Sequence, residues 1–372
     1  MIQAGKAMKV GIVTIQDITN YGNRLQNYAV SHVLQTQFGC KTMSLAAYKE
    51  KPFENGNHIL WLKNKIAKAM CVFPEVAEKR FGSGITRWRN FYNWNKQNIP
   101  TRNFYEHSSL PQRLNEEYDL FFAGSDQIWN YRFPGTNYDD YFLKFAQDSK
   151  KAAICGSFGV EDIPDEWKQT YIDGLSAFTH ISVREDAGAK IVKDLTGRDV
   201  PVLVDPVMLL SKDEWLRVAK KPRVDIFKPY ILKYYLGDET EEEKIDNWAK
   251  ENGYAVYELL NDRIPDLYSA GPGEFISLIA NAALVASDSF HCIAFAIIFR
   301  KPFVVYARRG SGNYMTSRLD TLLRKFKLQG RWKHLLRPDQ YLACDYSGVD
   351  ALVATEQEKA ANYIRTVLDS VR

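Results

Sequence analysis

Short apolar runs of strand length recur along the 372-residue chain, and longer segments with helical periodicity lie between them. The runs are nearly continuous rather than alternating with polar residues, which is typical of strands that are covered on both faces. They fall into two series. The first comprises Val10–Ile15, Tyr118–Ala123, Ala152–Phe158, His180–Val183 and Val202–Val204, and the second comprises Tyr230–Leu236, Tyr254–Leu259, Ala283–Ala286 and Phe303–Tyr306.

Helical patterns separate these runs, and strand–helix alternation predicts an α/β protein with mainly parallel sheets. Because the proline-bearing segment Pro206–Pro229 divides the two series, we expect two Rossmann-like domains, residues 1–210 and 211–372, rather than one barrel. Residues 48–111 do not continue this strand–helix alternation, and they predict a helical insertion in the first domain. An amphipathic pattern over Thr355–Val371 predicts a last helix that packs back on the first domain. The other expected helices are Leu25–Gln35, Trp167–Ala177, Ala187–Asp194, Glu241–Glu251, Phe275–Ala282 and Cys292–Phe299.

Composition narrows the class of protein. Hydrophobic residues make up 45% and charged residues 25%, which excludes a disordered or fibrous chain. The five cysteines include no C-x-x-C pair, which argues against a zinc ribbon or a disulfide scaffold and favours a reducing compartment. The start, Met1–Lys9, lacks the apolar stretch of a signal peptide, and no apolar run is long enough to span a bilayer. These features predict a cytoplasmic protein.

The net charge is only +4, but it is unevenly distributed. Between Arg300 and Arg337, eleven Lys and Arg residues face one acid, Asp320. Such a segment indicates an anionic ligand, although a solvated surface facing an acidic neighbour explains it equally well. Nucleic acid is not expected, because no helix-turn-helix, RNP-like or zinc-finger pattern accompanies the charge. Metal dependence is not expected either, since the carboxylates form no recognisable metal-binding set.

Ligands of open parallel sheets collect at the carboxyl ends of strands, so polar loops that follow strands are the candidate sites. Asn20-Tyr21-Gly22-Asn23-Arg24 follows the first strand, and its glycine and helix start suit an anion or a polar ligand. A plain β-to-α turn explains that segment too. Gly124-Ser125-Asp126-Gln127-Ile128-Trp129-Asn130 follows another strand, and its carboxylate, amides and indole suit a sugar. Equally, Ser125 or Asp126 caps the next helix and Trp129 is core.

Three further strand ends carry candidates. Arg184 closes one strand, where its guanidinium suits a carboxylate or phosphate, with pairing to an acidic neighbour as the alternative. Asp205, which precedes a proline, favours a structural turn. His291 starts a buried helix, where an imidazole binds an anion or relays a proton, unless it is a satisfied core residue. The loop Tyr306–Gly312 presents Arg308 and Arg309 as a phosphate or carboxylate clamp.

Taken together, these segments resemble the polysaccharide pyruvyl transferase family. The resemblance rests on ordered pieces between about Lys9 and Leu323, each modest alone and specific as a set. They are Asn20–Gln26, Gly124–Asn130, Ser182–Glu185, Val204–Pro206, Ser287–His291 and Arg300–Phe303.

The resemblance implies a glycosyltransferase-B-like arrangement of two domains, with the acceptor on the first and the donor on the second. It also implies transfer of a pyruvyl group from phosphoenolpyruvate to a sugar of a bacterial surface polysaccharide, often lipid-linked, with release of phosphate and no further cofactor. The enzyme would then be cytoplasmic, in peripheral contact with the inner face of the membrane. We expect the aromatic-rich insertion to select the acceptor.

The same resemblance associates His291 and Arg184 with the donor. The chemistry of the transfer then favours His291 as proton donor, with phosphate binding alone as the alternative, and Asp126 as the base for a sugar hydroxyl. Several family members carry an arginine where this chain has Ser289, so the donor's charges would be met by Arg184, Arg308, Arg309 and Arg318 beside Ser289. The residues expected at the acceptor are Asn20, Asn23, Arg24, Gln127, Trp129 and Asn130.

Two other functions fit the same features. A nucleotide-sugar-dependent glycosyltransferase would share the two-domain cleft and the sugar-suited loop, but it would bind a nucleotide. A non-catalytic glycan-binding protein would bind the acceptor and release no phosphate. Phosphate release from phosphoenolpyruvate in the presence of an acceptor separates these functions.

Overall fold

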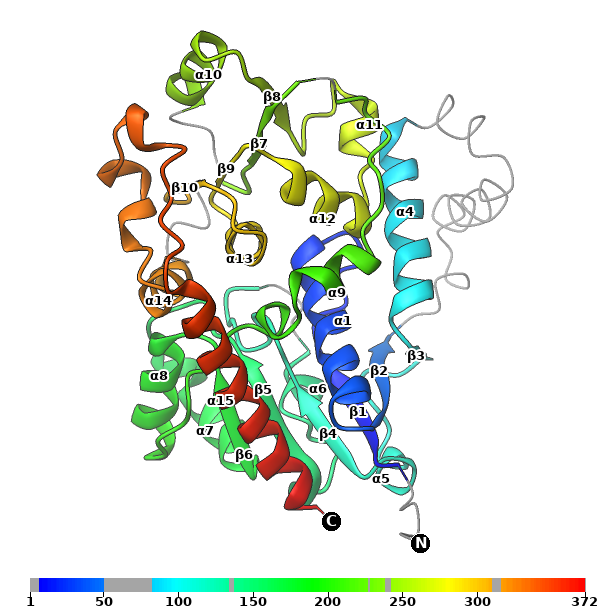
Figure 1. The fold of residues 1–372 in the computed structure, drawn as a ribbon. Coiled ribbons are helices and arrows are strands. Elements are labelled where there is room, and N and C mark those ends of the chain that lie inside the picture. The colour runs from blue at the N-terminus through cyan, green and yellow to red at the C-terminus, as the bar shows by residue number, and fades with distance from the viewer. Residues whose placement is uncertain are drawn as a thin grey trace, which may run out of the picture.

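Two parallel sheets form the frame of the molecule in the computed structural model, which describes residues 7–49, 82–133, 137–226, 228–237, 242–309 and 316–371. The first sheet has the order β3-β2-β1-β4-β5-β6 and the second the order β10-β9-β7-β8, with parallel pairing throughout both (Figure 1). The strands are β1 (Lys9–Val13), β2 (Lys41–Tyr48), β3 (Thr101–Tyr105), β4 (Leu120–Ala123), β5 (Lys151–Gly156), β6 (His180–Val183), β7 (Tyr230–Tyr234), β8 (Ala255–Glu258), β9 (Leu284–Ser287) and β10 (Phe303–Val305).

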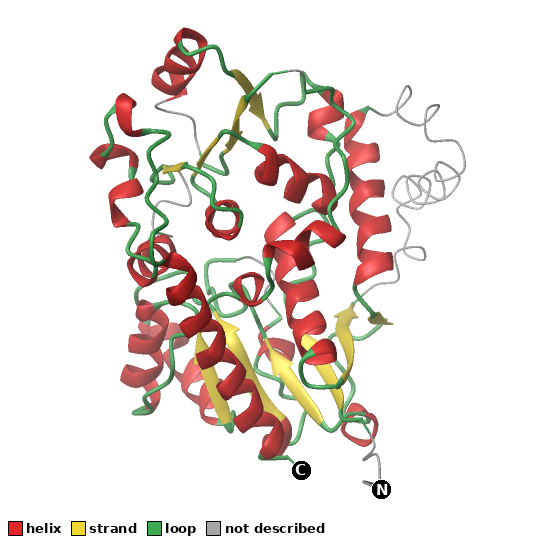
Figure 2. Cartoon of the chain, viewed as in Figure 1, coloured by secondary structure: helices red, strands yellow, loops and turns green. Residues whose placement is uncertain are grey.

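Helices connect the strands and cover both sheets (Figure 2). The predicted fold class, two Rossmann-like domains in a glycosyltransferase-B-like arrangement, is confirmed by this topology. The helices are α1 (Tyr21–Thr36), α4 (Ser83–Asn98), α5 (Leu114–Glu117), α6 (Tyr138–Tyr141), α7 (Asp165–Ser176), α8 (Asp186–Thr196), α9 (Lys212–Arg217), α10 (Glu242–Glu251), α11 (Pro265–Tyr268), α12 (Pro272–Asn281), α13 (Phe290–Ile298), α14 (Ser317–Lys325) and α15 (Val349–Asp369).

The two faces of the first sheet belong to different hydrophobic cores, because successive side chains of a strand point to opposite faces. Leu120 and Phe122 of β4 join one cluster, whereas Phe121 and Ala123 join the other. The first of these clusters continues without interruption into the second domain, where it includes buried residues of α12, α13 and α14. A shared core of this kind fixes the two domains against each other.

Helix α15 returns from the second domain to the first sheet (Figure 1). Its Tyr363 hydroxyl donates to the backbone carbonyl of Ala153 on β5 at 2.6 Å, and Ile364 and Val367 are buried in the cluster that spans both domains. Gln357 donates to the carbonyl of Met208 at 2.8 Å. The last helix therefore ties the two domains together along one side.

Two details of the sequence prediction are wrong. The expected insertion at residues 48–111 is not wholly helical, since β3 lies within it and pairs with β2 at the edge of the first sheet. Residues 50–81 of that insertion lie outside the described residues. The expected strand Val202–Val204 is reduced to one bridge between Val183 and Val202, because the chain turns away at Asp205-Pro206.

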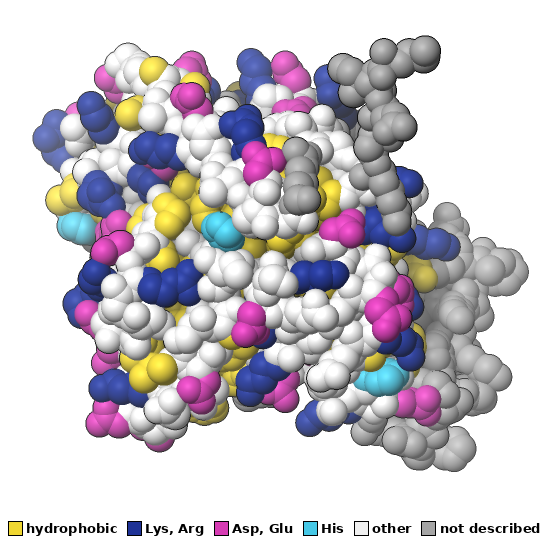
Figure 3. Space-filling view, turned by 90° about the horizontal axis from the view of Figure 1, so that it is seen from below, with side chains coloured by type: hydrophobic (Ala, Val, Ile, Leu, Met, Phe, Trp, Pro, Cys, Tyr) yellow, Lys and Arg dark blue, Asp and Glu magenta, His cyan; other side chains and the backbone are white. Residues whose placement is uncertain are grey.

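Described Lys, Arg, Asp and Glu side chains are mixed on the face of the first domain that looks away from the second domain. Seen from below, Lys and Arg side chains alternate with Asp and Glu side chains over this face (Figure 3). Among the described helices, none combines the length and the apolar character needed to cross a membrane.

Candidate active site

The carboxyl ends of strands from both domains meet at one point, and a buried arginine lies at its centre. Arg184, which follows β6, is 2% exposed. Its guanidinium donates to Asp126 at 3.1 Å and to Asp205 at 2.5 Å, and it lies 4.5 Å from the ring centre of Phe290 in the second domain. Asp126 follows β4, and Asp205 follows the bridge at Val202. One cation thus holds two carboxylates from separate loops in fixed positions.

The loop that carries Asp126 is bent tightly against β5. A Cβ atom on Gly124, whose φ is 111°, would lie 2.4 Å from the carbonyl oxygen of Ile154, so only glycine fits. Asp126 itself has a φ of 69°, which is rare for a residue with a side chain. Strained backbone of this kind persists where the surroundings hold it, and it is common at functional sites.

His291 reaches this cluster from the second domain. Its Nε2 atom is buried, lacks a hydrogen bond and lies 3.6 Å from Asp205. The Nδ1 edge of the ring lies against Gly22 at the start of α1, where a Cβ atom would come within 2.1 Å of Nδ1. The glycine of the Asn20–Arg24 motif therefore gives the imidazole room between the two domains.

Tyr21, next to this glycine, fastens the start of α1 to the second domain. Its hydroxyl donates to the carbonyl of Ala270 at 2.7 Å, and its ring stacks on Phe275 with ring centres 4.4 Å apart. Burial raises the pKa of Tyr21 to about 12, despite the opposing charge of Arg87, so the hydroxyl stays protonated as a donor. This contact fixes the distance between Gly22 and His291.

A cavity of about 190 Å³ opens beside these residues, and we call it the interdomain cavity. Asn20, Asp126 and Gln127 line it from the first domain. From the second domain, the polar lining residues are Tyr234, Ser289, His291, Arg308 and Arg318.

Among these lining residues, Arg318 indicates most directly which kind of ligand the cavity suits. It is 5% exposed, its Nε–H lacks a hydrogen-bond partner, and no carboxylate of the described residues forms an ion pair with it. Burial and the nearby charge of Arg184 lower the pKa of Arg318 to about 10, so the side chain is still a cation at neutral pH. Asp126 acts on Arg318 without forming an ion pair with it, and a buried cation without a direct ion pair is costly unless an anion binds there. Arg318 therefore gives the interdomain cavity a positive charge suited to an anionic ligand.

The two carboxylates remain ionised at neutral pH. Burial alone would raise the pKa of Asp126, but its electrostatic interactions with Arg184, His291 and Arg318 hold that pKa below its usual value. The pKa of Asp205 is lowered in the same way against its burial, by His291 and Arg184. Asp205 can therefore stabilise positive charge on the imidazole of His291 during proton transfer.

Several predicted acceptor residues prove to be interior. Trp129 is fully buried among aromatic rings, with Phe158 at 5.2 Å between ring centres, so it offers no face to a sugar. Asn130 is also fully buried, donating to Gln127 and accepting from the backbone of Arg132. Asn23 donates to Asp126 and holds that carboxylate in place. The prediction of direct acceptor contacts is wrong for Trp129 and Asn130, because the core takes up both side chains.

The predicted donor residues also divide. Arg308 and Ser289 line the interdomain cavity, and Arg308 is anchored by Asp288 at 3.2 Å. Arg184 lies behind the cavity wall, where its ion pairs position Asp126 and Asp205. Arg309 is exposed and does not line the cavity, and Gly310, Ser311 and Gly312 of the expected clamp lie outside the described residues.

The basic segment Arg300–Arg337 is mostly structural. Arg331 is buried and donates to backbone carbonyls, while Arg324 pairs with Asp186 and Lys325 pairs with Glu356. Of the segment's described residues, Arg308 and Arg318 line the interdomain cavity. The clustering of basic residues in the sequence therefore suggested more anion-binding side chains than the structure places at the cavity.

Sequence reasoning missed the part played by Asp205. Its Oδ1 accepts from the backbone of Val207, as expected for a turn, but its Oδ2 faces both Arg184 and His291. Its position at the end of the last β-segment of the first domain was the signal, since ligand sites gather at such ends. Tyr234 and Phe290 also line the cavity without having been predicted.

The contact between Gly22 and His291 makes a sharp prediction. Gly22→Ala is expected to lower the free energy of unfolding by about 1–3 kcal/mol, because the new methyl group overlaps the imidazole. Denaturant unfolding measures this loss. Gly330→Ala is the matched control, since a Cβ atom there meets no described atom within 4 Å. In a His291→Ala background the cost of Gly22→Ala should shrink, and an unchanged cost would contradict the contact.

Comparison with known proteins adds a family and a set of distant structures. A family model described as polysaccharide pyruvyl transferase matches residues 20–310. No curated protein matches the chain significantly.

Two similar solved structures are UDP-GlcNAc 2-epimerase from Neisseria meningitidis bound to UDP-GlcNAc and a putative UDP-N-acetylglucosamine 2-epimerase from Listeria monocytogenes. The first is 11% identical, with 98% of this chain and 99% of that chain covered and a TM-score of 0.43. The second is 11% identical, with 98% and 96% covered and a TM-score of 0.47. Likeness this distant says nothing of activity.

Proposed function

Because the chain belongs to the polysaccharide pyruvyl transferase family, we propose that it takes the pyruvyl group from phosphoenolpyruvate and joins it to two hydroxyls of one sugar as a cyclic ketal. Phosphate is the leaving group. Membership of the family supports the general activity, the transfer of pyruvyl groups to a polysaccharide. The observation that carries the choice of donor is the interdomain cavity, where the unpaired cation Arg318 lies in the same lining as His291.

The charges and the size of the cavity support phosphoenolpyruvate. This donor carries a carboxylate and a phosphate on three carbons, and Arg308 and Arg318 provide two guanidiniums to bind them. A volume of about 190 Å³ suits a donor this small. A nucleotide sugar is much larger and belongs with the larger sites, of roughly 300–1,000 Å³, that hold drug-sized ligands. The cavity thus favours phosphoenolpyruvate over the nucleotide-sugar alternative.

His291 is the proton donor of the proposed mechanism. Protonation of the methylene carbon of phosphoenolpyruvate turns it into a methyl group and leaves positive charge at the neighbouring carbon. The Nδ1 atom, beside Gly22 at the cavity, delivers the proton, while Asp205 faces Nε2 and stabilises the imidazolium. Arg184 holds Asp205 in position for this role.

Asp126 receives the proton of the attacking sugar hydroxyl. As a carboxylate with a lowered pKa it is a weak base, and it suffices here because an alcohol becomes strongly acidic as it bonds to a cationic carbon. The second hydroxyl then bonds to the same carbon, and the bond between that carbon and the bridging phosphate oxygen breaks. The two sugar hydroxyls release two protons. One of them restores to the enzyme the proton that was given to the methyl group, and the other leaves with phosphate. The reaction balances without an oxidant or reductant.

The test is a reaction of the purified protein with phosphoenolpyruvate and bacterial surface oligosaccharides. Phosphate release should require both substrates, and NMR of the product should show a ketal methyl group that carries deuterium when the reaction runs in D₂O. Consumption of a nucleotide sugar without phosphoenolpyruvate would overturn the proposal. Oligosaccharide binding with no phosphate release from any acceptor would also overturn it. A lipid-linked acceptor and action at the inner face of the membrane stay predictions.

Replacement of Arg318 tests the donor site. Arg318→Met is expected to weaken phosphoenolpyruvate binding about 10–100-fold, because charge-assisted hydrogen bonds contribute about 1.5–3 kcal/mol. Stability should be retained, since Arg318 forms no ion pair with a carboxylate of the described residues. Calorimetric titration with phosphoenolpyruvate measures the loss. Arg337→Met, an exposed residue of the same basic segment, is the control, and equal affinities of the two variants would contradict the assignment.

A further inference from the structure

A second pocket lies on the other side of the loop that joins β1 to α1. It has a volume of about 320 Å³, and we call it the tyrosine pocket. Asn20, Tyr21 and Gly22 of this loop region line the interdomain cavity, whereas Gln16, Ile18 and Arg24 line the tyrosine pocket. The remaining lining residues are Tyr48, Tyr92, Asn95, Lys96, Ile99, Pro100, Thr101 and Asn103.

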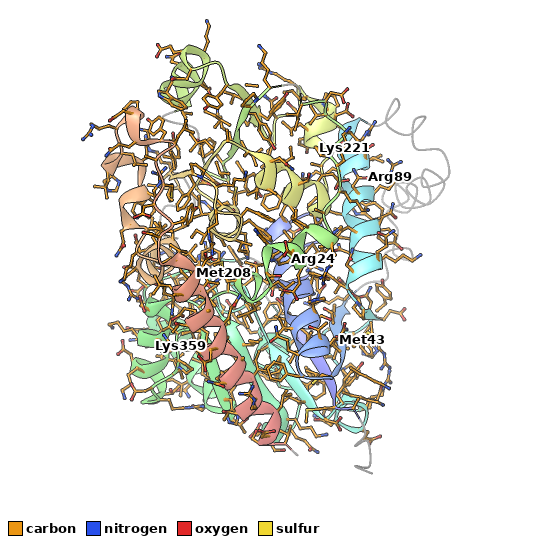
Figure 4. All side chains as sticks on the ribbon, in the orientation of Figure 1. Arg24, Met43, Arg89, Met208, Lys221 and Lys359 are labelled. Atoms are coloured by element: carbon orange, nitrogen blue, oxygen red, sulfur yellow. The ribbon has the colours of Figure 1, made fainter. Side chains whose placement is uncertain are left out.

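Arg24 gives this pocket an uncompensated positive charge. The residue is 4% exposed and lies on the first turns of α1, in the interior of the molecule (Figure 4). It donates to the carbonyl of Ile15 and to the side chain of Gln16, both neutral, and its Nε–H has no partner. Burial lowers the pKa of Arg24 to about 10, which leaves it charged at neutral pH. No carboxylate among the described residues pairs with it.

Asn95 of α4 is the second unsatisfied group. Both polar atoms of its side-chain amide are buried without a hydrogen-bond partner, although amides in protein interiors are nearly always bonded. Lys96, next to it, adds an exposed ammonium group to the same lining. The pocket therefore holds unused donors, one unused acceptor and two positive charges.

Exposed aromatic rings complete the pocket. Tyr48, Tyr92 and Tyr105 are the exposed aromatic side chains among the described residues, at 36–37% exposure, and all three gather here. Tyr105 stacks on Tyr48 with ring centres 5.6 Å apart, and Tyr92 stacks on Trp88. Rigid amphipathic rings of this kind offer an apolar face together with a hydroxyl that can hydrogen-bond. Sugar rings present the same combination of apolar faces and hydroxyl edges.

From these features we propose that the tyrosine pocket binds a negatively charged saccharide, with sugar rings against Tyr48 and Tyr92 and the anionic group at Arg24, Asn95 and Lys96. The anionic group is a phosphate or a carboxylate. In taking this saccharide to be part of the acceptor, the inference rests on the proposed function. The segment from Gln16 to Arg24 would then lie between this saccharide unit and the donor, and the sugar that reacts beside Asp126 would be another unit of the same acceptor.

Binding of matched sugar probes tests the pocket directly. The probes are the methyl glycosides, the 1-phosphates and the uronic acids of glucose, galactose and mannose, followed by saturation-transfer NMR on the full chain. We expect at least one charged probe to bind about tenfold or more tightly than its neutral counterpart. Asn95→Ala should weaken that binding about 10–100-fold, because a hydrogen bond to a charged group is lost. Its amide has no hydrogen-bond partner among the described residues, so folding should be unaffected.

Two variants, Arg24→Gln and Arg318→Met, then show which of the two pockets holds the charged probe. Charged-probe binding should fall in Arg24→Gln and persist in Arg318→Met, whereas phosphoenolpyruvate binding should show the reverse pattern. Loss of probe binding in Arg318→Met with retention in Asn95→Ala would place the sugar in the interdomain cavity and overturn the inference. Equal binding of charged and neutral probes, or no binding of any probe, would overturn it too. Probe binding that follows the expected pattern without any phosphoenolpyruvate binding would sustain the pocket and refute the donor.

Discussion

His291→Asn is expected to lower kcat by about 10²–10⁴-fold, the usual contribution of a positioned proton donor. Asparagine is smaller than histidine and can keep a polar amide atom at the place of Nδ1 beside Gly22, but it has no counterpart of Nε2 and cannot transfer a proton to carbon. Affinity for phosphoenolpyruvate should change much less, because Arg308 and Arg318 remain in the cavity. Single-turnover measurement of phosphate release, together with calorimetric titration of the donor, separates the two effects.

His180→Asn is the matched control for this variant. His180 starts β6 and so lies at the amino end of that strand, whereas the catalytic cluster lies at the carboxyl ends. The control should turn over at the wild-type rate. A folded His291→Asn protein with full activity would remove His291 from the mechanism. Normal kcat with much weaker donor binding would instead make it a phosphate ligand.

Buried strands were the most predictable part of the fold. β6 begins and ends at the predicted residues, and the strand pattern before Asp126 ends at Ala123 as predicted. All four residues of β4 are apolar and buried, so this run stands out from its surroundings, and three of the four residues of β6 are buried as well. Their positions in turn fixed which loops could meet, since parallel strands bring their carboxyl ends to one edge.

The edge of the first sheet was missed for the same physical reason. Of the five residues of β3, Thr101–Tyr105, only Phe104 is buried, so the segment carries almost no apolar signal. β2 alternates partly between buried and exposed residues and lies next to this edge strand. β2 depends on pairing with β1, and β3 depends on pairing with β2, rather than on their own composition. Such long-range pairing leaves little trace in sequence.

The candidate site was predictable at the level of loops but not of side chains. The loop at Gly124–Asn130 does lie at the junction, yet Asp126 faces the cavity while Trp129 turns into the core. Which way each side chain points depends on the bend at Gly124, where the backbone packs on Ile154 of β5. Likewise, the sequence of the basic segment shows many cationic residues but not their partners. The positions of acidic residues such as Asp186 and Glu356 in the fold decide which of these cations can bind a ligand.

Arg184→Met is expected to lower the free energy of unfolding by about 3–5 kcal/mol, the cost of breaking a buried ion pair from one side. Methionine has a similar length, but it leaves Asp126 and Asp205 buried without their shared cation. Their pKa values are depressed in the folded protein, so the stability they contribute is present above the ordinary carboxyl pKa and is lost as pH falls. Denaturant unfolding at several pH values measures both the size and the pH dependence.

The pH dependence distinguishes an electrostatic role of Arg184 from simple packing. At neutral pH the variant carries two unscreened carboxylates, whereas below about pH 4, near the ordinary pKa of aspartate, protonation relieves their repulsion. The difference in stability between wild type and Arg184→Met should therefore shrink as pH falls. A difference that stays constant with pH, or one below about 1 kcal/mol as for an exposed pair, would contradict the role. In either of those cases Asp205 would need another partner to hold it facing His291, and the proposed imidazolium would lose its support.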